Sequence, residues 1–222
     1  MAKAAKQSTR KRAAGKAGGA AAAGHDPVDA MLDLVAELGW RQVTLTRIAE
    51  ASGVSLGALY QKYASKTDML TAYAHRIDAA MLAALGDVAP LDSHDAALAK
   101  DRLFEAVMAR LDALTPHKAA IRVLMRELPG DPPALACFLY GGLRQGLDWT
   151  LASAGLDQSG LAGILRRKAL GAVYLDTLRV WLKDESVDLS ATMAHLDKRL
   201  GQAMRFLTAR SLISHMRDKA AV

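Results

Sequence analysis

The sequence predicts an all-α protein, and three observations support that fold class. Apolar residues recur every three or four positions along most of the chain, which is the spacing of a buried helix face. No segment alternates apolar and polar residues in the manner of a half-buried strand. An aspartate followed by a proline, which is a strong helix start, occurs at residues 26–27 and again at residues 131–132. We therefore expect helices joined by turns throughout.

Composition divides the chain into three expected parts: a disordered basic arm over residues 1–24, a small helical domain over residues 25–72, and a larger helical domain over residues 73–222. After Met1 the arm holds no large apolar residue, so it cannot bury enough surface to fold alone. Its Lys and Arg residues account for the whole formal net charge of +6, and the rest of the chain is balanced. A chain of 222 residues, 51% of them hydrophobic, can form one small and one larger core.

The small domain is expected to begin with a helix from Asp26-Pro27 to Gly39. A glycine just past the last turn can take the left-handed backbone conformation that ends a helix. Trp40 and Val43 then fold back as apolar plugs. The expected inward face of this helix carries Met31, Leu34, Val35 and Leu38.

Residues 44–70, TLTRIAEASGVSLGALYQKYASKTDML, form the most informative stretch. Thr44 is a good N-cap for one short helix, Gly53 permits a tight turn, and Ser55 is a good N-cap for a second short helix. Ser65, with an acid three residues later, opens the following helix. Two short helices joined by a tight turn are typical of a helix-turn-helix, whose second helix lies in the DNA major groove.

The residues around this motif resemble the TetR family of bacterial transcriptional regulators. The resemblance runs without a gap over residues 39–70, GWRQVTLTRIAEASGVSLGALYQKYASKTDML, and covers nearly all of that family's DNA-binding domain. Two positions depart mildly from the family pattern: Lys62 stands where histidine is frequent, and Tyr63 stands where phenylalanine is usual.

The resemblance implies two sets of contacts with duplex DNA. Phosphate contacts would come from Thr44 at a helix N-terminus and from Tyr60, Lys62 and Lys66. Thr46 and Arg47, in the first turn of the first short helix, would reach the backbone or a base edge. Base contacts would come from the start of the recognition helix, where apolar Leu56 and Ala58 suit a thymine methyl: Ser55, Leu56, Gly57 and Ala58.

The two tyrosines also have a structural interpretation, as core aromatics of a small domain. For Tyr63 we expect that packing role. For Tyr60 we expect a divided role, in which the ring is packed and the hydroxyl points outward.

The basic arm has two interpretations as well. It follows phosphates or enters the adjacent minor groove, which steepens the salt dependence of binding; or it is a solvated extension that adds only solubility.

The larger domain is expected to hold five helices. The first follows the breaks at Pro90 and Asp92 and carries Leu98 to Leu114; the second runs from Thr115-Pro116 to about Leu128-Pro129-Gly130. A third runs from residue 131 to about residue 154, and a long fourth spans residues 159–183. The last follows residues 188–190. The expected apolar stripe of the fourth is Leu161, Ile164, Leu165, Ala169, Ala172, Val173 and Leu178, and that of the last is Met193, Leu196, Leu200, Ala203 and Leu207.

The last two helices resemble, in position and length, the pair through which TetR-type proteins dimerise. A two-fold dimer would read a palindromic operator with half-sites about one helical turn apart, whereas one recognition helix reads only a few base pairs. We therefore expect a homodimer. The alternative is that both stripes form core within one chain.

The middle helices are expected to enclose a ligand pocket. The charged residues in this region are few, and their spacing allows Arg144 to pair with Asp148 and Asp176 with Arg179. A mostly apolar pocket suits a lipophilic or aromatic small-molecule effector. The candidate lining residues are Phe104, Val107, Met108, Leu111, Leu124, Met125, Phe138, Leu139, Leu143, Trp149, Tyr174 and Leu178.

A second resemblance covers residues 166–200, RRKALGAVYLDTLRVWLKDESVDLSATMAHLDKRL, which look like the C-terminal part of COQ9 proteins. That resemblance implies the TetR fold and lipid binding. It leaves open a lipid-like effector for a regulator, or a lipid-binding accessory protein that never touches DNA.

No catalytic, metal-binding or cofactor-binding pattern is evident, and we expect the protein not to be an enzyme. The histidines are scattered without metal-ligand spacing, and the glycines at residues 141–146 match no phosphate-binding fingerprint. The single cysteine, Cys137, excludes an internal disulfide, favours the cytoplasm, and is expected in the core as an inert thiol. The longest apolar run, residues 134–143, is too short to span a bilayer, so no membrane partner is expected.

Overall fold

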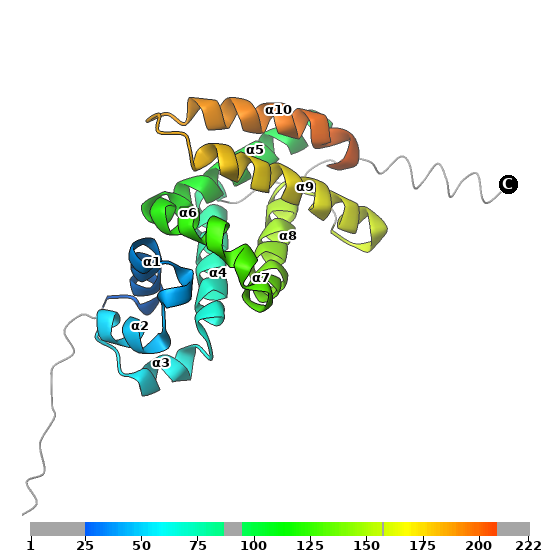
Figure 1. Cartoon of the computed structure of the whole chain (residues 1–222). Helices are drawn as coiled ribbons and strands as arrows, with labels where there is room; N and C mark the ends of the chain where they lie inside the picture. Colours follow the sequence, from blue (N-terminus) through cyan, green and yellow to red (C-terminus); the bar gives the residue numbers. More distant parts are fainter. Residues whose placement is uncertain (1–24, 87–94, 157, 208–222) are drawn as a thin grey trace, which may run out of the picture.

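The computed structural model describes residues 25–86, 95–156 and 158–207, and in these ranges every regular element is a helix (Figure 1). The predicted all-α fold is confirmed. The expected basic arm and the breaks at Pro90 and Asp92 lie outside the described residues.

Three short helices begin the described chain: α1 (Pro27–Leu38), α2 (Leu45–Ser52) and α3 (Leu56–Lys62), with a single 3-10 turn (Trp40–Gln42) after α1. The expected N-caps are present. The Asp26 carboxylate accepts a hydrogen bond from the Val28 amide at 2.8 Å. The Thr44 and Ser55 hydroxyls accept from the amides three residues later, at 3.3 Å and 3.2 Å respectively. Each helix therefore starts where local hydrogen bonding favours it.

Glycines end α1 and α2 in backbone conformations that other residues rarely adopt. Gly39 follows α1 with φ of 88°, and Gly53 joins α2 to α3 with φ of 69° and ψ of 15°. An L-residue with a Cβ is strained in this region of φ. These two turns set the directions of α2 and α3 relative to the helix before each of them.

The three helices share a small core in which Met31, Ile48 and Leu59 are almost fully buried. Trp40 and Val43 are buried behind α1, as expected. Within α1, however, Leu38 is exposed, whereas Val28 and Leu32 are buried. The inward face is thus rotated from the predicted stripe, because α1 also packs against α6 of the larger domain.

Helix α4 (Lys66–Leu85) leaves the small domain and enters the larger one (Figure 1). The larger domain adds α5 (Ala96–Leu114), α6 (Lys118–Glu127), α7 (Pro132–Phe138), α8 (Arg144–Ser153), α9 (Gly160–Trp181) and α10 (Ser190–Leu207). Helices α9 and α10 lie side by side across one end of the molecule, and α10 also packs on α5.

The expected helix from residue 131 to residue 154 is continuous but carries a π-helical turn, Leu139–Leu143, between α7 and α8. A π turn inserts one extra residue into the helical ladder. Gly142 lies inside it, and a Cβ there would come within 3.1 Å of the Ala74 Cβ. The glycine therefore allows α4 and the π turn to pack closely.

The apolar stripes of α9 and α10 have different surroundings. The α10 stripe packs inside the chain: Leu196, Leu200 and Leu207 are fully buried. On α9, Val173 and Leu178 are buried, but the N-terminal part of the predicted stripe is exposed, with 79% exposure for Leu161 and 45% for Ile164 and Leu165. The alternative of a purely internal stripe therefore fits α10 and does not fit the start of α9.

Both ion pairs expected from helix spacing are absent. Asp148 pairs with Arg167 of α9 at 2.6 Å, and Arg144 lies over the Tyr140 ring. Asp176 binds His195 at 2.9 Å and Arg199 at 2.7 Å, both on α10. Spacing along one helix identified the two aspartates that form ion pairs, but their partners lie on the neighbouring helices against which they pack.

Cys137 is exposed on α7 and not in the core, which corrects the sequence interpretation. On the same helix Ala134 is buried and Phe138 packs against the core, but Cys137 lies on a face that reaches solvent. Among the helices that the structure describes, none combines the length and apolar content needed to cross a bilayer.

Candidate functional site

The outer face of α2 and α3 is a solvent-exposed surface that carries most of the predicted DNA-binding residues. Leu56 is 50% exposed. The other predicted DNA-binding residues that are exposed are Thr44, Thr46, Arg47, Ser55, Gly57, Ala58, Tyr60 and Lys62. Beyond the backbone of α3 itself, no atom of the described residues lies within 4 Å of the position that a Cβ on Gly57 would occupy, so nothing in that part of the chain covers the start of α3.

The position of α3 suits entry into a groove. It lies at the far end of the small domain from α9 and α10 (Figure 1). Leu59 anchors it from below, since this side chain is 1% exposed and packs into the small-domain core. A short helix held by its inner face and open on its outer face can enter a major groove about 12 Å wide.

Tyr60 differs from its expected divided role. Its ring is 68% exposed and is not packed. Tyr63, by contrast, is half-buried against the core, in line with the packing role expected for it. Tyr63 follows the last residue of α3 and has an extended backbone, with φ of −139° and ψ of 118°. The helical spacing that would place it on the same face as Tyr60 therefore does not apply.

Lys66 is turned inward, which differs from the expected phosphate contact. Its ammonium group donates to the Trp40 carbonyl at 2.7 Å and to the Val43 carbonyl at 3.3 Å. It also lies 4.2 Å from the centre of the Trp40 ring. Burial lowers the pKa of Lys66, opposed by Asp131. Lys66 thus connects the start of α4 to the turn after α1.

Trp40 joins the small domain to the larger one. Its indole N–H donates to the Asp131 carboxylate, just before α7, at 3.0 Å. This hydrogen bond is the main reason that the pKa of Asp131 lies below its usual range. The two domains are therefore tied by a buried tryptophan as well as by α4.

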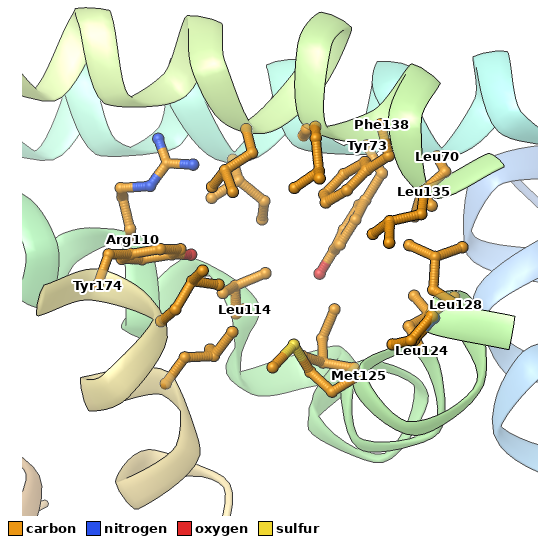
Figure 2. Close-up of a pocket in the computed structure, with 18 of the residues that line it drawn as sticks. Leu70, Tyr73, Arg110, Leu114, Leu124, Met125, Leu128, Leu135, Phe138 and Tyr174 are labelled. Carbon is orange, nitrogen blue, oxygen red and sulfur yellow. The ribbon is translucent and has the colours of Figure 1, made fainter. Parts of the chain in front are cut away.

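A cavity of about 330 Å³ lies within the larger domain, between α4, α5, α6, α7 and α9 (Figure 2). This volume is at the small end of ligand pockets. Apolar side chains dominate the wall. Seven residues predicted from the sequence are in it: Leu124, Met125, Phe138, Leu139, Leu143, Tyr174 and Leu178.

The other predicted lining residues lie elsewhere. Val107 and Leu111 are fully buried in the core, and Phe104 and Met108 pack against that core. Trp149 is 47% exposed on the outer side of α8. Helical spacing indicates that such residues are apolar positions of a helix, but it cannot tell a cavity wall from a packed core or an outer surface.

The structure adds a wall of the cavity that the sequence interpretation missed. Helix α4 contributes Leu70, Tyr73, Ala74 and Ile77. Their spacing is itself a helical stripe and was a usable signal. We call the helix-turn-helix formed by α2 and α3 the recognition unit. Because α4 also belongs to the small domain, one helix connects the cavity with the recognition unit.

The cavity has few polar groups. Figure 2 shows the Tyr73 hydroxyl reaching into the open space and Arg110 beside the Tyr174 ring. Burial raises the pKa of Tyr73 well above its usual value, so the hydroxyl stays protonated near neutral pH. Arg179 is also on the wall. After the hydrogen bond from His195, its charge is one of the effects that lower the pKa of Asp176.

Arg110 and Asp78 form a buried ion pair between α5 and α4, with side-chain exposures of 5% and 6%. Burial alone would lower the pKa of Arg110, but Tyr174 and Asp78 outweigh it and the pKa is raised. The guanidinium also lies 5.4 Å from the centre of the Tyr174 ring. The charge on Arg110 is thus already matched by Asp78 and contributes little net charge to the cavity.

The fold and this surface define a class: a helix-turn-helix protein whose larger helical domain encloses an apolar cavity. Residues 28–73 match the family of bacterial regulatory proteins, tetR family. The N-terminal helix-turn-helix therefore resembles that family in sequence, and the whole chain has the fold of TetR-family regulators.

Solved structures agree with this fold. The chain is similar to the TetR transcriptional regulator from Nitrosomonas europaea ATCC 19718, with 25% identity, a TM-score of 0.59, and coverage of 80% of this chain and 95% of that chain. It is also similar to a TetR transcriptional regulator from Rhodococcus sp. RHA1, with 16% identity, a TM-score of 0.54, and coverage of 80% and 92%. The family matched over residues 28–73 and these two solved proteins are transcriptional regulators, which are not enzymes.

Residues 165–207 match the COQ9 family, over α9 and α10. This agrees with the second resemblance noted in the sequence. No curated protein sequence matches the chain.

Proposed function

We propose that this protein is a one-component transcriptional regulator, acting as a repressor, that binds a palindromic operator as a homodimer and is released by a small lipophilic or aromatic effector. The observation that carries the proposal is the exposed, unobstructed start of α3, held from below by buried Leu59. The reducing cytoplasm, where the DNA is, is the proposed compartment.

In this proposal the exposed face divides its contacts. Ser55, Leu56, Gly57 and Ala58 meet base edges, and the apolar Leu56 and Ala58 suit thymine methyl groups. Thr44, Tyr60 and Lys62 contact phosphates. Thr46 and Arg47 reach the backbone or a base edge, and Arg47 is oriented by a 2.9 Å hydrogen bond to the Gln42 carbonyl. Lys66 has its phosphate role only if it leaves its two carbonyl partners.

Dimerisation is proposed through α9 and α10. The exposed Leu161, Ile164 and Leu165 lie on the N-terminal part of α9, where the described residues of one chain leave them uncovered. Adjacent exposed apolar side chains mark interaction sites. A two-fold dimer would place two α3 helices on successive half-sites.

The effector would act through the cavity. A ligand that binds one arrangement of the small domains more tightly than another shifts the population toward it. Since α4 contacts the cavity and continues into the small domain, a change in the cavity can alter the separation of the two α3 helices.

A COQ9-like, lipid-binding accessory protein without DNA binding is the second candidate. The match over residues 165–207 and the apolar cavity favour it. An accessory protein without DNA binding would not need an exposed Leu56 on a capped, well-anchored α3, where this side chain is 50% exposed.

A salt-titrated mobility-shift assay separates the two candidates. The full chain is tested with DNA from upstream of its own gene and with random DNA of equal length. A regulator binds the upstream DNA more tightly at physiological salt, and its affinity falls as salt rises. Equal affinity for both DNAs contradicts the regulator.

Light scattering tests the dimer. The chain has a mass of 23.7 kDa, and twice that mass is expected at micromolar concentration. Leu165→Lys should shift the population toward the single chain, whereas Val187→Lys, at a fully exposed position between α9 and α10, should not. A wild-type protein that stays at the mass of one chain contradicts the dimer.

A further inference from the structure

A series of polar contacts begins at Tyr73 in the cavity wall and reaches α1, the helix that packs on α2. Tyr73 lies on α4 with only 3% of its surface exposed, and its hydroxyl projects into the cavity (Figure 2). The surrounding wall is almost entirely apolar. An effector that buries a polar atom there needs a partner for it, because an unpaired polar group in an apolar site is costly.

The hydroxyl of Tyr73 already has a partner outside the cavity wall. It lies 3.2 Å from Nδ1 of His117, in the 3-10 turn Thr115–His117 between α5 and α6. The two rings also pack edge to face, with centroids 5.3 Å apart and planes at 88°. Tyr73 and His117 therefore hold each other in one orientation.

The second ring nitrogen of His117 faces the small domain. Its Nε2 lies 3.4 Å from the Asp29 carboxylate on α1. A carboxylate beside Nε2 favours the proton on that nitrogen, which leaves Nδ1 as the acceptor for the Tyr73 hydroxyl. Burial lowers the pKa of His117, opposed by Asp29, so the neutral ring that this arrangement needs is favoured near pH 7.

Asp29 is a junction on α1. It also pairs with Arg76 of α4, and Arg76 lies 3.7 Å from Asp26, the N-cap of α1. Helix α1 in turn packs on α2. A change at Asp29 therefore acts on the helix that supports the recognition unit.

We infer that Tyr73 senses the effector, and that the effector is an apolar molecule carrying a hydrogen-bond-accepting oxygen such as a ketone carbonyl. The oxygen takes the Tyr73 hydroxyl from His117. His117 then loses the contact that orients it toward Asp29, and α1 is held less firmly against the larger domain. The inference rests on the proposed function and specifies its effector class and its coupling.

The coupling is tested without any effector. Tyr73→Phe removes the hydroxyl and keeps the ring, and His117→Gln breaks the next contact. Each should weaken operator binding by roughly threefold to tenfold, the range set by one lost neutral hydrogen bond. The double variant should lose no more than the worse single variant, because both changes break one series of contacts. Tyr140→Phe is the matched control, since Tyr140 is exposed and outside the cavity wall.

Operator affinities of Tyr73→Phe and His117→Gln equal to wild type, or losses that add in the double variant, would overturn the coupling. Circular dichroism and the melting temperature identify a variant that is simply unfolded, in which case the other single variant decides. A wild-type protein that does not distinguish the operator from random DNA refutes the proposed function instead.

The effector class is tested without DNA, so its result is independent of the proposed function. Benzophenone and diphenylmethane have nearly the same shape and differ by one carbonyl oxygen. By titration calorimetry, benzophenone should bind wild type at least about fivefold more tightly, in line with one hydrogen bond. Tyr73→Phe should remove this preference and Tyr140→Phe should keep it. Equal binding of the two probes, binding of neither, or a preference that survives Tyr73→Phe would overturn the effector class.

Discussion

Gly146 on α8 should tolerate alanine poorly. A Cβ built at this position would lie 2.7 Å from Nη2 of Arg110 and 2.7 Å from Oδ1 of Asp78. Both side chains are buried, and they form an ion pair with each other. Neither can move aside into solvent, so the added methyl must separate the pair or push α8 away from α4 and α5.

The expected magnitude follows from two opposing terms. Replacing a helical glycine by alanine favours the helix by about 0.5–1 kcal/mol. Disrupting a buried ion pair costs about 3–5 kcal/mol, and an overpacked site alone costs about 1–3 kcal/mol. Asp78 already has one buried carboxylate oxygen without a partner among the described residues, so it has no second bond to rely on. We expect Gly146→Ala to lower the free energy of unfolding by about 2–4 kcal/mol.

Urea denaturation at one fixed protein concentration measures this effect, because a dimer's stability depends on concentration. Gly57→Ala is the control: it is also helical, and its Cβ would meet no atom within 4 Å. The control should be as stable as wild type or slightly more stable. If Gly146→Ala is as stable as Gly57→Ala, the ion pair can shift freely and the reasoning about its confinement fails.

Three further predictions concern the small domain and the α9–α10 turn. In urea denaturation, Lys66→Met should lower the free energy of unfolding by about 1–2 kcal/mol, since charge-assisted hydrogen bonds to the Trp40 and Val43 carbonyls are lost. Lys62→Met is the control and should not change the urea midpoint. Lys62→Ala should weaken binding to every DNA sequence and reduce the salt slope by about one, whereas Leu56→Ala should change the preferred sequence in a binding-site selection; an unchanged preference counts against base contact by α3. Hydrogen bonds from Ser186 and Thr192 hold the pKa of Asp184 far below its usual range. Because the folded-state pKa is depressed, the stabilisation is present above about pH 4 and is lost as the pH falls further, so the urea midpoint of Asp184→Asn should fall less than that of wild type between pH 5 and pH 3.

The sequence by itself determined the helical elements and the type of the N-terminal domain. Caps and glycine turns act over three or four residues, so Asp26, Thr44, Ser55 and Gly53 could be interpreted without any knowledge of distant contacts. The spacing of apolar residues then gave the buried side of each short helix, with an error at Leu38, which is exposed because α1 also faces α6.

The tertiary structure decided which chemical groups meet. Asp176 pairs with His195 and Arg199 and not with Arg179. Lys66 donates to the carbonyls of Trp40 and Val43. Trp149 is exposed to solvent, whereas Tyr73 lines the cavity. Such pairings depend on the angles at which helices far apart in sequence cross. Successive residues of a helix point about 100° apart around its axis, so a shift of one residue would give every side chain a different neighbour. Local hydrogen bonding determines where a helix begins and ends, whereas close packing between helices determines what each of its faces touches.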